Sequence, residues 1–163
     1  MKLPLLLTLV CATCASAGSA SDLAATGHAA SPAFDAFPVA HEQPLFEHLA
    51  VAGSRVSCWN RAYTLGADGL LAAIENGGET VLAAPMRLTG QIDGEDPSGL
   101  EFTRETLESL PHAHLVRTRA RRGDVLLTIL TRIENDGMAR FTIEIQSERD
   151  IAFKDLAIRI PLR

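Results

Sequence analysis

The fold class of this chain follows most directly from residues 125–146, whose sequence is VLLTILTRIENDGMARFTIEIQ. The run 125–130 is apolar at almost every position, which predicts a central strand covered on both faces. Asn135-Asp136-Gly137 then supplies the residues that a hairpin turn favours. After this turn, apolar and polar residues alternate. One face carries Ala139, Phe141, Ile143 and Ile145, and the other carries Arg140, Thr142, Glu144 and Gln146. A period of two predicts a strand with one buried face.

Short apolar runs separated by Gly, Asp, Asn and Pro continue in both directions from this hairpin, from about residue 45 to residue 163. In the last run, Leu156, Ile158 and Ile160 are expected to face the core. The other expected strands lie within residues 55–65, 70–75, 80–82, 86–89, 100–109 and 113–121. No long amphipathic helix is indicated. The sequence therefore predicts an all-β fold, an antiparallel β-sandwich of about eight or more strands, with a partly closed barrel as the alternative.

The composition is that of one globular domain, with 163 residues, 47% hydrophobic and 21% charged. Lys and Arg number 15 against 20 Asp and Glu, so the formal net charge is -5. This balance argues against an electrostatic grip on nucleic acid or on anionic lipid.

The N-terminus has the features of a secretory signal peptide. Lys2 precedes an apolar run at residues 3–12, which is too short for a membrane-spanning helix, and Ala15-Ser16-Ala17 forms a small-x-small cleavage pattern. We expect residues 1–17 to be a signal peptide cut after Ala17, and the protein to be exported to the periplasm or the extracellular space. A lipid anchor on Cys11 or Cys14 is the alternative.

Residues 18–44 are rich in Ala, Ser, Gly and Pro, and we interpret them as a flexible leader ahead of a domain at 45–163. Once residues 1–17 are removed, Cys58 is the one cysteine left. An internal disulfide is then impossible, and the stability of an exported domain must come from its core.

The candidate binding residues lie in the run 55–65. If this run is one strand, Ser57, Trp59, Arg61 and Tyr63 share a face. An aromatic platform beside an arginine can stack on a sugar ring and hydrogen-bond to it, so Trp59, Arg61 and Tyr63 are the predicted carbohydrate contacts. The alternative is that the large aromatic residues are part of the core.

No catalytic or metal-binding residues are assigned, and no cofactor is expected. His112 and His114 lie two residues apart and would supply half of a metal site, but no third ligand is evident; a small enzyme built on them and a nearby carboxylate is a remaining hypothesis. Cys58 is expected to be a buried thiol. The alternating Arg117, Arg119 and Arg121 are expected to form cross-strand ion pairs on a solvated face.

An ordered set of motifs resembles one known family. These are Val56-Ser57-Cys58-Trp59-Asn60-Arg61-Ala62-Tyr63-Thr64-Leu65, Gly69-Leu70-Leu71-Ala72-Ala73-Ile74, Glu79-Thr80-Val81-Leu82-Ala83-Ala84-Pro85-Met86-Arg87-Leu88, Glu134-Asn135-Asp136-Gly137-Met138 and Leu156 to Leu162. Together they resemble the N-terminal β-sandwich of glycoside hydrolase family 123-like proteins, over about residues 45–163.

This resemblance implies a domain that precedes a catalytic barrel acting on N-acetylgalactosamine-containing glycans. The family's acidic catalytic pair belongs to that barrel, so no residue here receives a catalytic role. The chain is thus expected to be a non-catalytic module whose partners are a catalytic barrel or a glycan. A free-standing secreted domain that binds a protein or a cell-wall partner is the alternative.

Overall fold

The computed structural model describes residues 5–11 and 48–163, and their secondary structure is almost entirely strand. The elements are β1 (Leu5–Cys11), β2 (Ala50–Ala52), β3 (Arg55–Cys58), β4 (Arg61–Leu65), β5 (Leu71–Asn76), β6 (Glu79–Thr80), β7 (Arg87–Ile92), the 3-10 turn η1 (Pro97–Gly99), β8 (Phe102–Ser109), β9 (Ala113–Arg122), β10 (Val125–Glu134), β11 (Ala139–Gln146) and β12 (Phe153–Arg159). The predicted all-β fold is confirmed.

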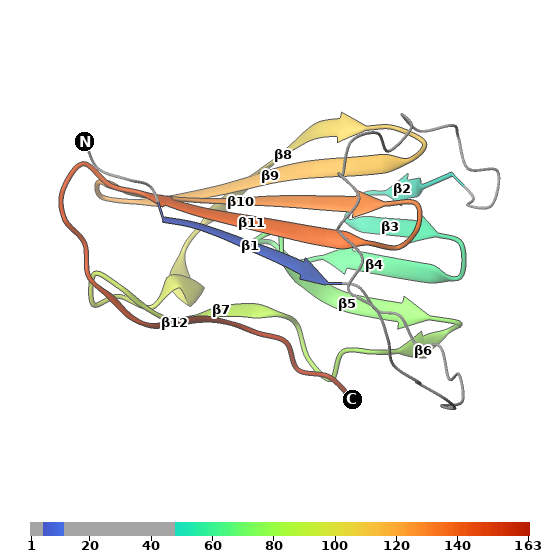
Figure 1. The fold of residues 1–163 in the computed structure, drawn as a ribbon, viewed down its shortest axis with the longest axis horizontal. Helices are drawn as coiled ribbons and strands as arrows, with labels where there is room; N and C mark the ends of the chain where they lie inside the picture. The colour runs from blue at the N-terminus through green and yellow to red at the C-terminus, as the bar shows by residue number, and fades with distance from the viewer. Residues whose placement is uncertain (1–4, 12–47) are drawn as a thin grey trace, which may run out of the picture.

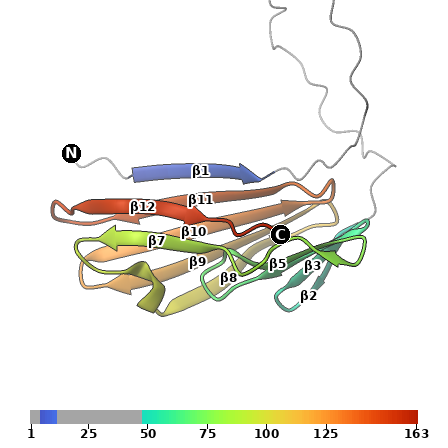
Figure 2. The same cartoon turned by 90° about the horizontal axis from the view of Figure 1, so that it is seen from below.

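The strands form antiparallel sheets that stack as a sandwich (Figures 1 and 2). One sheet has the order β1-β11-β10-β9-β8. The sheet β2-β3-β4-β5-β6 and the pair β12-β7 lie against it. Within β2–β6 and within β8–β11, consecutive strands pair through short turns, as the regular spacing of Gly, Asn and Asp predicts, whereas β7 pairs with the distant β12.

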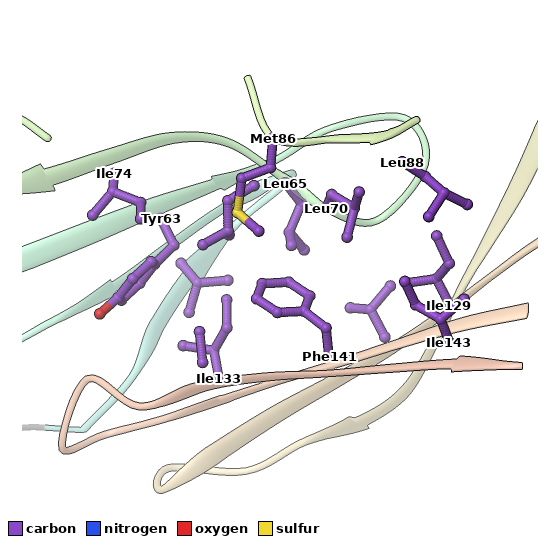
Figure 3. Close-up of a cluster of buried hydrophobic side chains, with 14 of the residues drawn as sticks. Tyr63, Leu65, Leu70, Ile74, Met86, Leu88, Ile129, Ile133, Phe141 and Ile143 are labelled. Carbon is purple, nitrogen blue, oxygen red and sulfur yellow. The ribbon is translucent and has the colours of Figure 1, made fainter. Parts of the chain in front are cut away.

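The core lies between the layers (Figure 3). Phe141 and Ile143 of β11 belong to one layer and Tyr63 and Ile74 to the other, and all four side chains are part of the cluster between the layers. All four of the alternating apolar residues of β11 are buried, whereas none of its polar residues is. The face assignment made from the period of two is therefore confirmed, and burial of these apolar side chains is the main force that holds the layers together.

The prediction for β10 is confirmed in part. The strand is central, between β9 and β11. Its outer face is not covered by a second layer, however, because Leu126 and Leu130 remain only partly buried. They lie opposite Arg121 and Arg117 on β9, whose long aliphatic stems can cover apolar surface while the guanidinium groups stay in water. Apolar residues on both sides of a strand thus do not require layers on both sides.

The run 55–65 is not one strand. It is a hairpin in which β3 ends at Cys58 and β4 begins at Arg61, with Cys58 opposite Arg61. The turn at 59–60 reverses the chain and breaks the alternation on which the predicted shared face depended. The expectation that Trp59 and Tyr63 line one strand face is therefore wrong.

Part of the predicted signal peptide is described. Residues 5–11 form β1, which pairs antiparallel with β11 from Leu5 opposite Ile145 to Cys11 opposite Ala139. The predicted leader, 18–44, and the cleavage pattern at 15–17 lie outside the described residues. None of the helical structure that can be described is long and apolar enough to cross a membrane.

Candidate functional site

Four turns gather at one end of the sandwich, on the right in Figure 1. We call this the turn end: residues 59–60, 77–78, 110–112 and 135–138. Backbone hydrogen bonds tie neighbouring turns together. The Gly77 amide donates to the Asn60 carbonyl at 2.8 Å, and the Asn135 amide donates to the His112 carbonyl at 3.0 Å. Loops held on a rigid sheet in this way are common places for binding residues.

Trp59 is the most exposed aromatic residue of the turn end, with 63% of its surface accessible. It is the first residue of the two-residue turn between β3 and β4, and its φ is 49°. This left-handed conformation favours glycine and is rare for a bulky residue, costing about 1–3 kcal/mol. A large apolar side chain is thus presented to solvent at a position where the backbone favours a small residue.

Arg61 and Tyr63 lie behind Trp59 on β4. Arg61 is partly exposed and lies over the β10–β11 turn, because a Cβ added to Gly137 would lie 2.5 Å from its Nη1. Tyr63 is 2% exposed, and its hydroxyl donates a 2.6 Å hydrogen bond to the Gly137 carbonyl. Of the three predicted carbohydrate contacts, Trp59 and Arg61 therefore reach the surface at the same end. Tyr63 does not, because it is part of the core.

The two histidines of the sequence motif are in different environments. His112 is exposed in the β8–β9 turn, whereas His114 is 4% exposed on β9. Burial lowers the pKa of His114, whose Nδ1 lies 3.3 Å from Ser109 Oγ. Among the described residues, no group of three His, Cys, Asp or Glu side chains could hold a metal ion.

The prediction for Cys58 agrees with the structure, and the prediction of cross-strand ion pairs on β9 is confirmed for Arg117. Arg121 instead donates from Nε to the Gly123 carbonyl at 3.0 Å. Cys58 is buried, and burial raises the pKa of its thiol; Arg61 lowers this pKa to a smaller extent, and Asp136 raises it further. A neutral thiol is a poor nucleophile. Arg117 pairs with Glu105 across β9 and β8 at 2.6 Å. This pair is partly exposed, as expected of ion pairs on a solvated sheet face, which contribute little to stability.

A pocket of about 290 Å³ lies at the other end of the sandwich. Apolar side chains form much of its lining: Ile92, Pro97, Leu100, Ala120, Val125 and Leu127. Charged side chains join them, and these already pair with one another. Arg149 binds both Asp93 and Asp124, and Arg122 binds Glu95 at 3.3 Å. The volume lies just below the range of about 300–1,000 Å³ that is usual for small-molecule sites.

The pairing within this pocket also sets its electrostatics. Burial opposes ionisation of Asp124, but its own amide, Ser147 and Arg149 outweigh burial and lower its pKa. A carboxylate stabilised in this way is suited to holding a loop in place rather than to accepting a proton. Sequence reasoning missed this pocket, because Asp93, Asp124 and Arg149 lie far apart along the chain.

The chain is thus an all-β sandwich domain with an exposed tryptophan at its turn end and a pocket at the opposite end. Its family is shown by comparison with known proteins: residues 49–163 match the family described as "Glycoside hydrolase 123, third domain". The chain thus belongs to the glycoside hydrolase 123 family and corresponds to a non-catalytic domain of it. The resemblance seen in the sequence is confirmed, although the family description names the third domain where the sequence suggested the N-terminal one. No curated protein matches the chain.

Proposed function

We propose that this chain is an exported, non-catalytic sandwich domain that supports a glycoside hydrolase catalytic barrel and contacts the glycan through the turn end. The observation that carries the glycan contact is the exposed Trp59, which the β3–β4 turn presents in a backbone conformation unfavourable for its type. Residues held in such sparsely populated backbone conformations cluster at binding and active sites.

The chemistry of the turn end suits a sugar. A pyranose ring has an apolar face of C–H groups that packs on an indole, and hydroxyl groups around its rim. Arg61 lies two residues beyond Trp59 and can donate to such hydroxyl groups, since a guanidinium has five N–H donors. Tyr63 does not reach the glycan; its hydroxyl holds the β10–β11 turn in place through the Gly137 carbonyl, and Arg61 packs against this turn.

The chain offers a direct experimental readout, because Trp59 is its single tryptophan. Intrinsic fluorescence therefore reports on this side chain alone. Titration with N-acetylgalactosamine-containing oligosaccharides should shift and saturate the emission. The same titration followed by calorimetry should show at least about a tenfold loss of affinity for Trp59→Ala, equal to about 1.4 kcal/mol.

Phe102→Ala provides a matched control, since this partly buried aromatic residue lies on β8 and outside the turn end. It should lower stability but leave glycan affinity unchanged. If Trp59→Ala is folded, as judged by circular dichroism, and binds the oligosaccharides as tightly as the original chain does, Trp59 does not contact the glycan. Support of a barrel is tested separately, by titrating this chain into a catalytic domain of the same family.

A further inference from the structure

The outer edge of β11 differs from the other sheet edges in the described part of the chain. β6 has two residues and β2 has three. β8 is interrupted by a register shift, and so is the pairing of β12 with β7, a six-residue strand that is the remaining edge. Short strands and bulges are devices that stop edges from pairing with other chains. β11, by contrast, has eight residues, no proline, and a continuous register with its neighbours.

The structure itself shows that this edge accepts a strand. β1 pairs with seven successive residues of β11. β1 provides no charged residue opposite the two charged residues of β11, however: Leu6 lies opposite Glu144, and Val10 lies opposite Arg140. On its other side, Arg140 lies opposite Arg132 of β10, which already pairs with Glu108 and Glu134 and therefore offers Arg140 no acidic partner. If residues 1–17 are removed on export, as proposed above, β11 becomes a free edge on which Arg140 has no acidic residue opposite it on β10.

The sequence of β11 is complementary to itself. Antiparallel pairing of two β11 strands about an axis through Thr142 puts Arg140 of each copy opposite Glu144 of the other. It also puts Phe141 opposite Ile143, so that both cores continue on the same side. Registers shifted by one residue would send apolar side chains to the outer face, and registers shifted by two would separate the charges. Phe141 and Ile143 are buried and Arg140 is exposed, as the register centred on Thr142 requires.

We propose that the chain lacking residues 1–17 forms a two-fold symmetric dimer through β11, in which each Arg140 pairs with Glu144 of the second copy. The sheet β11-β10-β9-β8 then continues across the axis into its symmetry mate. Such an interface is closed, since each free edge is used once. In the unprocessed chain β1 takes the same edge, so removal of the leader and dimerisation are linked.

The test uses the full chain produced in an exporting host, with its N-terminus determined by mass spectrometry and its mass in solution by light scattering. We expect the processed protein to be a dimer and a chain with processing blocked by Ala15→Gln and Ala17→Gln to be a monomer. Glu144→Arg should place like charges opposite each other and weaken the dimer by at least about tenfold. Arg140→Glu should do the same.

Two rescue arms separate this interface from any other. The double variant R140E/E144R restores opposite charges and should dimerise as the original chain does. Mixing the two single variants should give a heterodimer, although each alone is a monomer. Arg119→Glu, on the exposed face of β9 and away from the edge, is the control and should leave the dimer unchanged.

Several results would overturn the proposal. They are a monomeric processed chain, an exported chain that still carries residues 5–11, a dimer that tolerates Glu144→Arg, or single variants that do not combine. None of these results bears on glycan binding at the turn end, because Trp59 is not on β11. Failure of the dimer and failure of the proposed function can therefore be distinguished.

Discussion

The hydroxyl of Tyr63 donates a 2.6 Å hydrogen bond to the carbonyl of Gly137, joining β4 in one layer to the β10–β11 turn of the other. The two residues are 74 positions apart in the chain. The bond is buried, so it is made where water cannot replace it. It fixes the turn beneath Arg61 and thereby links the core to the exposed turn end.

Tyr63→Phe should test this link. The change keeps the ring and removes only the donor, which leaves the Gly137 carbonyl without that partner. We expect the free energy of unfolding to fall by about 1–3 kcal/mol, as measured by urea denaturation. An unchanged midpoint would show that water or another donor replaces the hydroxyl.

Gly137→Ala should be more destabilising than Gly123→Ala. Both glycines have positive φ, 84° and 60°, so both substitutions incur the backbone cost of about 1–2 kcal/mol. Only at Gly137 would the new Cβ also meet a neighbour, Nη1 of Arg61 at 2.5 Å; at Gly123 nothing lies within 4 Å. The difference between the two variants in chemical denaturation measures that contact, and equal losses would contradict it.

Trp59→Gly should be more stable than Trp59→Ala by about 1 kcal/mol. Both variants lack the indole, so they differ only in how well the backbone accepts a φ of 49°. Thermal melts of the pair isolate the backbone strain at the tip of the β3–β4 hairpin. If the alanine variant proves as stable as the glycine variant, the backbone at Trp59 is not strained.

Stability should depend on pH through His114. Burial lowers the pKa of this imidazole in the folded chain relative to its usual value of 6.5. As the pH falls below about 6.5, the unfolded chain therefore binds a proton that the folded chain does not, and stability decreases. Above that pH the effect disappears, because the residue is neutral in both states.

Denaturation curves between pH 5 and pH 8, a range of about 3 units around the histidine pKa, check this prediction. In His114→Gln, the free energy of unfolding should decrease less steeply as the pH falls below about 6.5. The control is the same substitution at His112, an exposed residue in the neighbouring turn. Identical slopes in the His114 variant and the original chain would show that other groups cause the loss.

Much of the fold could be predicted because it is encoded locally. The alternation in β11 and the Asn135-Asp136-Gly137 turn act within a few residues, and both are present as expected. The β3–β4 hairpin was missed because its turn, Trp59-Asn60, contains no glycine or proline to mark it. A bulky residue in a left-handed conformation has no local signal, and only pairing of β3 with β4 on a packed layer stabilises it.

The candidate site could be predicted only in part, for the same reason. Trp59 and Arg61 were identified by residue type, but Tyr63 was assigned to the surface set although it is in the core. The far pocket was missed altogether, because Asp93, Asp124 and Arg149 come together only when three separate loops meet.

By itself, the sequence determined that this protein is an antiparallel β-sandwich of glycoside hydrolase 123 type, since period-two patterning, turn residues and ordered motifs are properties of the chain. Tertiary structure alone decided that Tyr63 is buried, that Trp59 is exposed, and that β11 lies between β10 and β1 in its sheet. Those outcomes depend on which segments distant in sequence share a layer. The free energy of burial, which is non-directional and is summed over the whole core, selects that arrangement.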